Sequence, residues 1–465
     1  MKKYFIAFLA CMLSLVSDAF GQIVALTMPE EDEVKIGNVQ VSKDSDNIYV
    51  DYDMLFGSRI LSCQVDLEIS LNAGKSFEKL IDGLSGDINN IGKPGHKQIA
   101  VSLNTYAKKL ANKSLVFKVS VSNVVFAPFD YSNAYDLSSR GTANCYIVSS
   151  AGAFKFKPVK GNSSESVGSV SSVEVLWESF GTSQKPSVGD LIHSVDYDEG
   201  FVVFSTPHSF KEGNAVIAAK DASGTILWSW HIWLTDQPQG QTYYNNAGIM
   251  MDRNLGATSA TPGDVCALGL LYQWGRKDPF LGSSSISRRV EAESTGIWPS
   301  AVSSSTSKGT AEYATRNPMT FITAGSSSDW DWHYSSRNNE LWQSSKTIND
   351  PCPVGWGVPD GGDNGVWSKA CSSPDDFYDY PYDSTDEGMN FSGKFGSAST
   401  IWYPASGFRF HHDGSLYHVG YDGSYWSAAP SSYRACYLYL DRNGNVYPSS
   451  SGGRARGRVV RCLQE

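Results

Sequence analysis

The chain has 465 residues, a net charge of −10 and a pI near 5.3. This acidic balance argues against a nucleic-acid-binding protein, because binding to a phosphate backbone requires a basic patch. Aromatic residues make up 12% of the chain, charged residues only 18%, and there are 43 glycines. That composition favours short strands joined by turns over helical bundles, which are rich in Ala, Glu, Lys and Leu.

A secretory leader is predicted at residues 1–21. Two lysines precede an apolar run at residues 4–16, and a small-x-small site follows, which places the cleavage after Gly21. The run is shorter than the roughly 20 apolar residues of a membrane-spanning helix, and we expect no transmembrane segment elsewhere. A lipoprotein box ending at Cys11 is an alternative, but it would cut the apolar run short. We therefore expect an exported protein, either at the cell surface, associated with the outer membrane, or extracellular.

The mature chain, about 440 residues long, has room for about three domains. The first, residues 22–125, contains three stretches, 48–53, 65–70 and 116–121, that alternate apolar and polar residues, the period of half-buried strands. Strands at this spacing, with turn residues between them, predict a β-sandwich. The segment resembles the small immunoglobulin-like module found ahead of other domains in exported Bacteroidetes proteins. The residues that carry this resemblance are 70–77, 84–87 and 94–97.

The second segment, residues 126–236, also alternates like an all-β domain, with a hairpin turn at 221–224. Within its last strand, Trp228 and Trp230 share one face and Trp233 lies on the other. Such a stripe can be a sugar-binding platform or core, and we expect core. From Gly213 to Trp233, the segment resembles a second β-sandwich module that recurs in Bacteroidetes surface proteins.

The third segment, residues 237–465, holds most of the tryptophans and long Ser/Gly/Asp loops. Residues 268–276 are its best candidate for a short helix. Six motifs in order resemble the Fibrobacter succinogenes major paralogous domain family, which is related to the formylglycine-generating enzyme fold and to C-type lectin domains. They lie at 251–256, 271–276, 350–359, 403–409, 425–428 and 459–462. The resemblance implies a loop-rich α+β domain with a C-type-lectin-like fold.

Eight cysteines, one of them in the leader, leave seven in the mature chain. Disulfides are the usual state of cysteines in an exported chain, and the odd number leaves at least one unpaired or paired between chains. The family-like positions of Cys352 and Cys462 imply a disulfide. It would close a loop of about 110 residues and stabilise the fold by up to about 4–5 kcal/mol. Two free buried thiols are the alternative. The pairing of the others stays open: Cys63, Cys145, Cys266, Cys371 and Cys436.

We expect no enzymatic activity, no catalytic residue, no cofactor and no metal site. The formylglycine-generating enzymes use two cysteines five positions apart, whereas this chain has Cys436 but Ser431 at the earlier position. No Gly-x-Ser-x-Gly or His-Glu-x-x-His motif is present. Residues 411–413, His-His-Asp, could suggest a base or a metal ligand, but the glycine that follows favours a hairpin turn.

Two charged stretches remain. Residues 375–387 are acidic and could form a calcium loop, but they lack the spacing of an EF-hand, and a solvated loop is favoured. Four arginines near the C-terminus, Arg454, Arg456, Arg458 and Arg461, alternate as in a strand and predict one solvated face.

The sequence thus predicts an adhesin-like surface protein that binds a glycan or a protein. A structural or fimbrial subunit and a modifying enzyme are the alternatives, and the ligand-binding residues are unknown.

Overall fold

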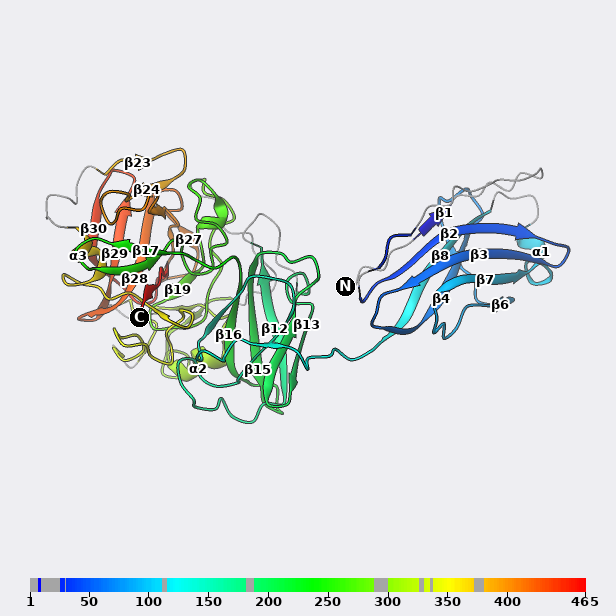
Figure 1. Ribbon diagram of the computed structural model, residues 1–465, viewed down its shortest axis with the longest axis horizontal. Helices are drawn as coiled ribbons and strands as arrows, with labels where there is room; N and C mark the ends of the chain where they lie inside the picture. The colour runs from blue at the N-terminus through cyan, green and yellow to red at the C-terminus, as the bar shows by residue number, and fades with distance from the viewer. Residues whose placement is uncertain are drawn as a thin grey trace. The chain divides into compact units, whose positions relative to one another are not determined.

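The structure is a computed structural model. It describes residues 7–9, 26–29, 31–110, 115–180, 188–287, 300–325, 330–334, 338–371 and 380–465. The protein is mostly β, as predicted, with several separate sheets and few helices. The chain divides into two compact units, residues 1–130 and 131–465 (Figure 1). The predicted leader lies, apart from residues 7–9, outside the described residues. Among the helices described, none is long and apolar enough to cross a membrane.

The first unit contains two four-stranded sheets over one core. The first sheet has the strand order β2 (Val34–Lys43), β3 (Asn47–Phe56), β7 (Gly95–Ser102), β6 (Leu84–Gly86). The second sheet has the strand order β1 (Ala7–Leu9), β8 (Val116–Phe126), β4 (Ile60–Ser70), β5 (Glu78–Lys79). Helix α1 spans Leu103–Leu110. Alternate residues point inward, so that Val50 and Tyr52 from β3 share the core with Val65 and Leu67 from β4. This alternation is the predicted pattern of a two-sheet sandwich.

The second unit begins with another pair of sheets. The strand order of one sheet is β10 (Cys145–Val148), β16 (Ile226–Leu234), β15 (Gly213–Lys220), β12 (Ser172–Ser179). The strand order of the other is β13 (Ser194–Asp198), β14 (Phe201–Ser205), β11 (Ala153–Phe156), β9 (Tyr135–Asp136). The predicted hairpin turn is present, because the Gly224 amide donates to the Asp221 carbonyl. Trp228 and Trp230 lie in the core of this sandwich, and Trp233 lies in the core beyond it. The tryptophan stripe is therefore core, as expected.

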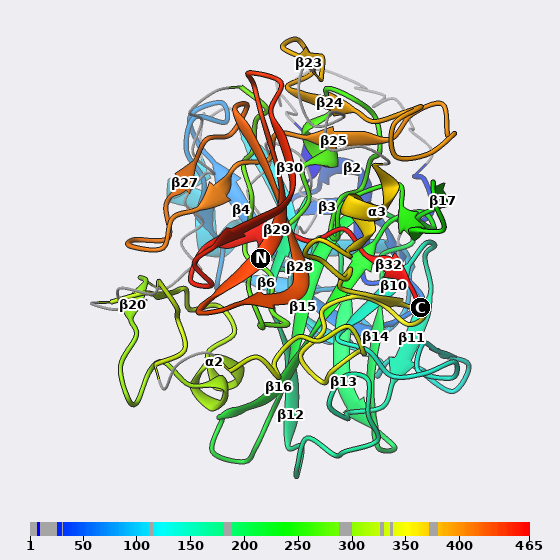
Figure 2. The same cartoon turned by 90° about the vertical axis from the view of Figure 1, so that its left-hand side faces the viewer.

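The remainder of the second unit holds small sheets around one large sheet. One small sheet has the strand order β17 (Gly240–Tyr243), β18 (Gly248–Met251), β32 (Leu463–Gln464), β22 (Trp356–Gly357). A second consists of β20 (Val302–Ser303) and β21 (Ile322–Thr323). A third has the strand order β23 (Tyr382–Asp383), β24 (Gly388–Asn390), β25 (Trp402–Pro404). The seven-stranded sheet has the order β27 (Leu416–Tyr417), β26 (Phe408–Arg409), β31 (Gly457–Val459), β28 (Asp422–Ser431), β29 (Arg434–Asp441), β30 (Val446–Gly452), with β19 (Leu271–Gln273) beside β31. Figure 2 shows β28, β29 and β30 side by side. The helical elements are η1 (Val265–Ala267), α2 (Ala311–Arg316) and α3 (Val366–Ala370).

The helix predicted at residues 268–276 is wrong, because this stretch contains strand β19. Gly269 and Gly275 flank the strand with φ of 74° and 84°, a left-handed conformation that ends regular structure and suits glycine. The Gln273 side chain is buried and donates to the backbone carbonyls of Ile322 and Ala455 at 2.7 and 2.8 Å. Tertiary hydrogen bonds thus override the apolar pattern that suggested a helix.

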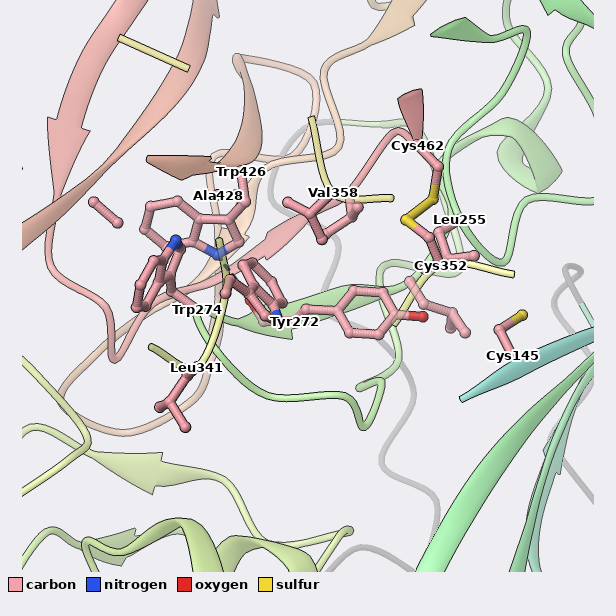
Figure 3. Packing of buried hydrophobic residues seen from close by; sticks show 14 of the residues in the cluster. Cys145, Leu255, Tyr272, Trp274, Leu341, Cys352, Val358, Trp426, Ala428 and Cys462 are labelled. Atoms are coloured by element: carbon pink, nitrogen blue, oxygen red, sulfur yellow. Dashed lines mark hydrogen bonds between the residues drawn. A yellow bond between two sulfur atoms is a disulfide. The ribbon is translucent and has the colours of Figure 1, made fainter. Parts of the chain in front are cut away.

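The core that contains the disulfide joins the two halves of the second unit. Cys352 and Cys462 are bonded, as predicted, and both are fully buried. Figure 3 shows this disulfide beside Leu255, with Cys145 on the adjacent sandwich strand. Residues 126–236 and 237–465 both contribute to this core, so the boundary predicted at 236 falls inside one compact unit. The division into three domains stays a prediction.

Candidate ligand-binding face

The seven-stranded sheet presents two chemically different faces. On one, the apolar face, Tyr425, Leu438, Leu440, Val446 and Val459 are fully buried in a common hydrophobic core. The opposite face, here called the tyrosine face, carries Ser424, Trp426, Tyr437, Tyr439, Tyr447 and Arg458. Strand pairing sets this division, because Trp426 is opposite Tyr437 and Ser424 is opposite Tyr439. One face is thus ordinary core, and the other is rich in groups that can form hydrogen bonds.

The tyrosines form a ladder that runs from the interior to solvent. Trp426 is fully buried and meets Tyr437 edge-on at 5.7 Å between ring centroids. Tyr437 meets Tyr439 at 6.4 Å, and Tyr439 stacks on Tyr447 at 6.0 Å. Tyr447 is 43% exposed, so the outer end of the ladder offers an aromatic ring to solvent. A ring held in place by stacked neighbours provides a rigid apolar platform for a ligand.

A hydrogen-bonded group lies beside the ladder. The Asp422 carboxylate accepts from the Tyr439 hydroxyl at 3.1 Å and pairs with Nδ1 of His418. This bond to Asp422, opposed by partial burial, raises the pKa of His418 above its ordinary value. The His418 side chain is 53% exposed. Its Nε2 makes no hydrogen bond with a described residue and can donate to a ligand from a fixed orientation.

The four arginines near the C-terminus do not form one solvated face, and that prediction is wrong. Arg454, Arg458 and Arg461 are each only 1% exposed, and Arg456 is half-buried. Their guanidinium groups lie on aromatic rings: Arg454 over Trp274 at 4.2 Å and Arg461 over Tyr403 at 3.9 Å. Of the four, only Arg458 lies in a strand, β31, because Arg454 and Arg456 are in the turn before it and Arg461 follows it. Alternation in the sequence also could not show that aromatic rings cover these side chains.

Arg458 and Arg456 adjoin the tyrosine face. The guanidinium carbon of Arg458 lies 3.5 Å from the centroid of the Tyr437 ring, and that of Arg456 lies 4.8 Å from the Phe408 ring. Burial is the largest influence on the pKa of Tyr437 and raises it, but the positive charge of Arg458, a hydrogen bond with Ser450 and further contacts with the two arginines together lower it. Burial and the charges of its neighbours, Arg458 first, lower the pKa of Arg456 to about 10. Arg456 is therefore charged at neutral pH.

The thiol position singled out by the sequence lies at the turn between β28 and β29. Ser431 pairs with Arg434 there, and Cys436 is buried on the adjacent strand with a free thiol. Burial raises the pKa of Cys436, although a hydrogen bond with Ser431 partly opposes this. A thiol that is protonated at neutral pH is a poor nucleophile and a poor soft-metal ligand. In the described ranges, no group of three His, Cys, Asp or Glu side chains could hold a metal ion.

Two other sequence candidates have local structural roles. The His-His-Asp stretch is a hairpin turn, as expected: the Gly414 amide donates to the Phe410 carbonyl at 2.8 Å, and β26 pairs with β27. The first part of the acidic stretch, up to residue 379, lies outside the described residues. In the rest, Asp383 accepts backbone hydrogen bonds from Thr385 and Asp386, and Glu387 accepts from Tyr382. That the whole stretch is a solvated loop rather than a calcium loop stays a prediction.

Sequence reasoning did not single out the tyrosine face as a site. Its members come from four strands, between residues 422 and 458, and the alternation of Tyr437, Leu438, Tyr439 and Leu440 shows only that one face is apolar and the other aromatic. That alternation, next to an unusual run of arginines, was the available signal. Nothing in it indicates that Asp422 and His418 lie beside these rings, because this depends on how β26, β28 and β31 pair.

Comparison with known proteins gives little. No protein-family model matches the chain, and no curated protein matches it. One similar solved structure is described as a Bacteroides ovatus mixed-linkage glucan utilization locus protein, SGBP-B, in complex with a mixed-linkage heptasaccharide. It is 14% identical with a TM-score of 0.13, and the match covers 52% of this chain and 55% of that one. The chain thus spans about half the length of that protein.

Proposed function

We propose that this protein is exported and binds a saccharide on the tyrosine face, as a ligand-binding protein of the cell surface. One observation carries this proposal: the exposed ring of Tyr447 is stacked on Tyr439, whose hydroxyl bonds to the Asp422 carboxylate that orients His418. A sugar ring has an apolar C–H face and a rim of hydroxyls. The stacked rings suit the first, and the carboxylate and imidazole suit the second.

The test begins with the full chain on a glycan array, followed by titration calorimetry with the glycans that bind. Tyr447→Ala removes the exposed platform, and we expect at least tenfold weaker binding, the usual loss on truncating an aromatic anchor. Tyr244→Ala is the matched control, because Tyr244 is 40% exposed but lies outside the tyrosine face. Unchanged binding by Tyr447→Ala would overturn the proposed site. An array without any bound glycan would favour the structural or fimbrial alternative.

We also propose that the C-terminal region has no formylglycine-generating activity. That chemistry requires two thiolates for a soft copper ion, and a serine hydroxyl such as that of Ser431 is a far poorer ligand. The raised pKa of Cys436 argues in the same direction. The protein, loaded with copper, is incubated with a Cys-x-Pro-x-Arg peptide, and mass spectrometry follows the peptide cysteine. Conversion to formylglycine above a metal-only control would refute this proposal.

A further inference from the structure

Three arginines gather at the edge of the tyrosine face, and the charge of Asp422 acts on two of them, Arg456 and Arg458. Arg434 and Arg456 lie 5.1 and 5.9 Å from the same indole ring, that of Trp330, and Arg456 and Arg458 both lie on Phe408. No Asp or Glu in the described part of the chain forms an ion pair with any of the three. We call Arg434, Arg456 and Arg458 the arginine cluster. The chain has a net charge of −10, so this cluster is a positively charged region in an acidic protein.

Several buried donors in this region have no hydrogen-bond partner among the residues that the structure describes. They are Nε and Nη2 of Arg458, Nε of Arg434 and Nε2 of His411. Arg458 is 1% exposed and His411 is 2% exposed. Buried polar groups in native proteins are nearly always paired, and a buried charge without a partner costs several kcal/mol. These donors in one place leave hydrogen-bonding capacity for an acceptor.

His411 adds a neutral donor to the charged ones. Burial, together with the neighbouring Arg456, lowers the pKa of His411 to about 4, so the ring is neutral at pH 7. Its Nδ1 lies 3.4 Å from Nε of Arg456 and accepts from it. The single ring proton is therefore on Nε2, which is the unpaired atom.

The backbone around the cluster is strained. Trp330 and His418 have φ of 56° and 61°, a left-handed conformation that is uncommon for a residue with a side chain and a true outlier for a tryptophan. A side-chain carbon at Gly453 would lie 2.4 Å from Cβ of Trp330, and one at Gly452 would lie 2.6 Å from Nη2 of Arg458. Residues in such conformations persist where the surrounding structure holds them and concentrate at ligand sites.

We propose that the arginine cluster binds the acidic group of a saccharide, a carboxylate or a sulfate, whose sugar ring lies on the tyrosine face. This inference rests on the proposed function and narrows it to acidic polysaccharides. Guanidinium groups bind both carboxylates and sulfates through parallel N–H donors. The cluster and the platform are continuous, because Arg458 lies 3.5 Å above the Tyr437 ring. That continuity favours an acidic sugar over an acidic peptide, which would use the charge but not the stacked rings.

The experiment measures binding of the full chain to four polymers: polygalacturonate, dextran sulfate, neutral dextran and poly-glutamate. We expect one of the two acidic polysaccharides to bind at least tenfold more tightly than dextran or poly-glutamate, and its affinity to fall as NaCl rises from about 50 to about 500 mM. The polymer that binds shows whether the group is a carboxylate or a sulfate.

Variants then connect the preference to the cluster. Arg434→Gln and Arg456→Gln each remove one charge, and we expect each to weaken acidic-polysaccharide binding at least tenfold. Arg456→Lys keeps the charge and retains most of the binding. Arg442→Gln is the control, because Arg442 lies over Tyr421 at 5.7 Å, outside the cluster, and we expect unchanged affinity. Circular dichroism confirms that each variant is folded.

The outcomes separate the two proposals. If neutral and acidic polysaccharides bind equally and the arginine variants change nothing, the acidic-group site is wrong while saccharide binding stands. If poly-glutamate binds as tightly as the acidic polysaccharides, the site recognises charge without the sugar, and the inference also fails. If no polysaccharide binds at all, both proposals fall together.

Discussion

The two faces of the seven-stranded sheet are made by the same strands but differ in what their burial achieves. On the apolar face, Leu438 and Leu440 are fully buried against other hydrocarbon groups. Across the sheet, Ser424 and Arg458 are equally buried, yet Oγ of the first and two nitrogens of the second have no hydrogen-bond partner among the described residues. Burial stabilises the fold on the apolar side, whereas at Ser424 and Arg458 on the other side it opposes folding.

This difference separates stability from function within one sheet. Apolar burial contributes about 25 cal/mol for each Å² removed from water, whereas an unpaired buried polar group costs about 1–3 kcal/mol. A sheet that retains such groups loses stability at those positions. Proteins commonly do so where a site must be ready for its ligand.

The largest expected effect is on the apolar face. Leu438→Ala removes a fully buried side chain, and we expect the free energy of unfolding to fall by about 2–5 kcal/mol, the range for leucine truncations in a core. Urea denaturation of the purified protein measures this. Tyr447→Ala on the exposed end of the other face serves as the control, with a change below about 1 kcal/mol. Equal losses in both variants would mean that the two faces do not differ as described.

The second prediction has the opposite sign. Arg458→Met replaces a buried guanidinium by an apolar side chain of similar length, and we expect stability to be unchanged or to rise by up to about 2 kcal/mol. The lost contact with the Tyr437 ring limits the gain. Binding to the acidic polysaccharide should fall in the same variant. A loss of more than 2 kcal/mol would show instead that Arg458 is a structural residue.

Much of the fold follows from the sequence, because alternation is a local property. The strands β3, β4 and β8 of the first unit lie where the period-two pattern places them. The Cys352–Cys462 disulfide and the buried tryptophans of β16 are also as expected. Each of these predictions needed only the pattern of neighbouring residues, the amino-acid composition of the chain, or motifs that occur in the same order as in a known family.

The rest depends on contacts between distant residues. The stretch at 268–276 is apolar enough for a helix, but its middle forms a strand because Gln273 bonds to chain segments about 50 and 180 positions away. The buried state of Arg458 likewise results from Phe408, Trp426 and Tyr437, which belong to three other strands. No local pattern shows that a face carrying arginines will be covered by aromatic rings.

A smaller effect is expected from the hydrogen bond that links the ladder to its acidic neighbour. Tyr439→Phe deletes the hydroxyl that donates to Asp422 at 3.1 Å, and we expect a loss of about 1 kcal/mol in unfolding free energy, the net value of one such bond. Phe retains the stacking on Tyr447. Saccharide affinity should fall less than in Tyr447→Ala, which titration calorimetry can compare. A fall as large as in that variant would place the hydroxyl, rather than the ring, at the centre of recognition.

The smallest effect, and the most specific in its pH dependence, comes from His418. Its pKa is raised in the folded protein, chiefly by the hydrogen bond to Asp422, so the pair stabilises the fold fully below the unfolded pKa near 6.5. This contribution is lost as the pH rises through the higher folded pKa. The side chain is 53% exposed, which limits the effect to about 0.2–1 kcal/mol. We therefore expect wild type to exceed His418→Gln in unfolding free energy by that amount near pH 5.5, and by about nothing near pH 9.

Comparing the two proteins at each pH isolates this term, because other histidines act in the opposite direction. Burial lowers the pKa of His231 to about 3, so the unfolded chain takes up a proton there before the folded one does, and total stability falls as the pH drops below about 6.5. That loss is common to wild type and variant and cancels in their difference. A difference that grew with rising pH would contradict the His418–Asp422 pair, and with it the orientation of the imidazole on which the tyrosine face depends.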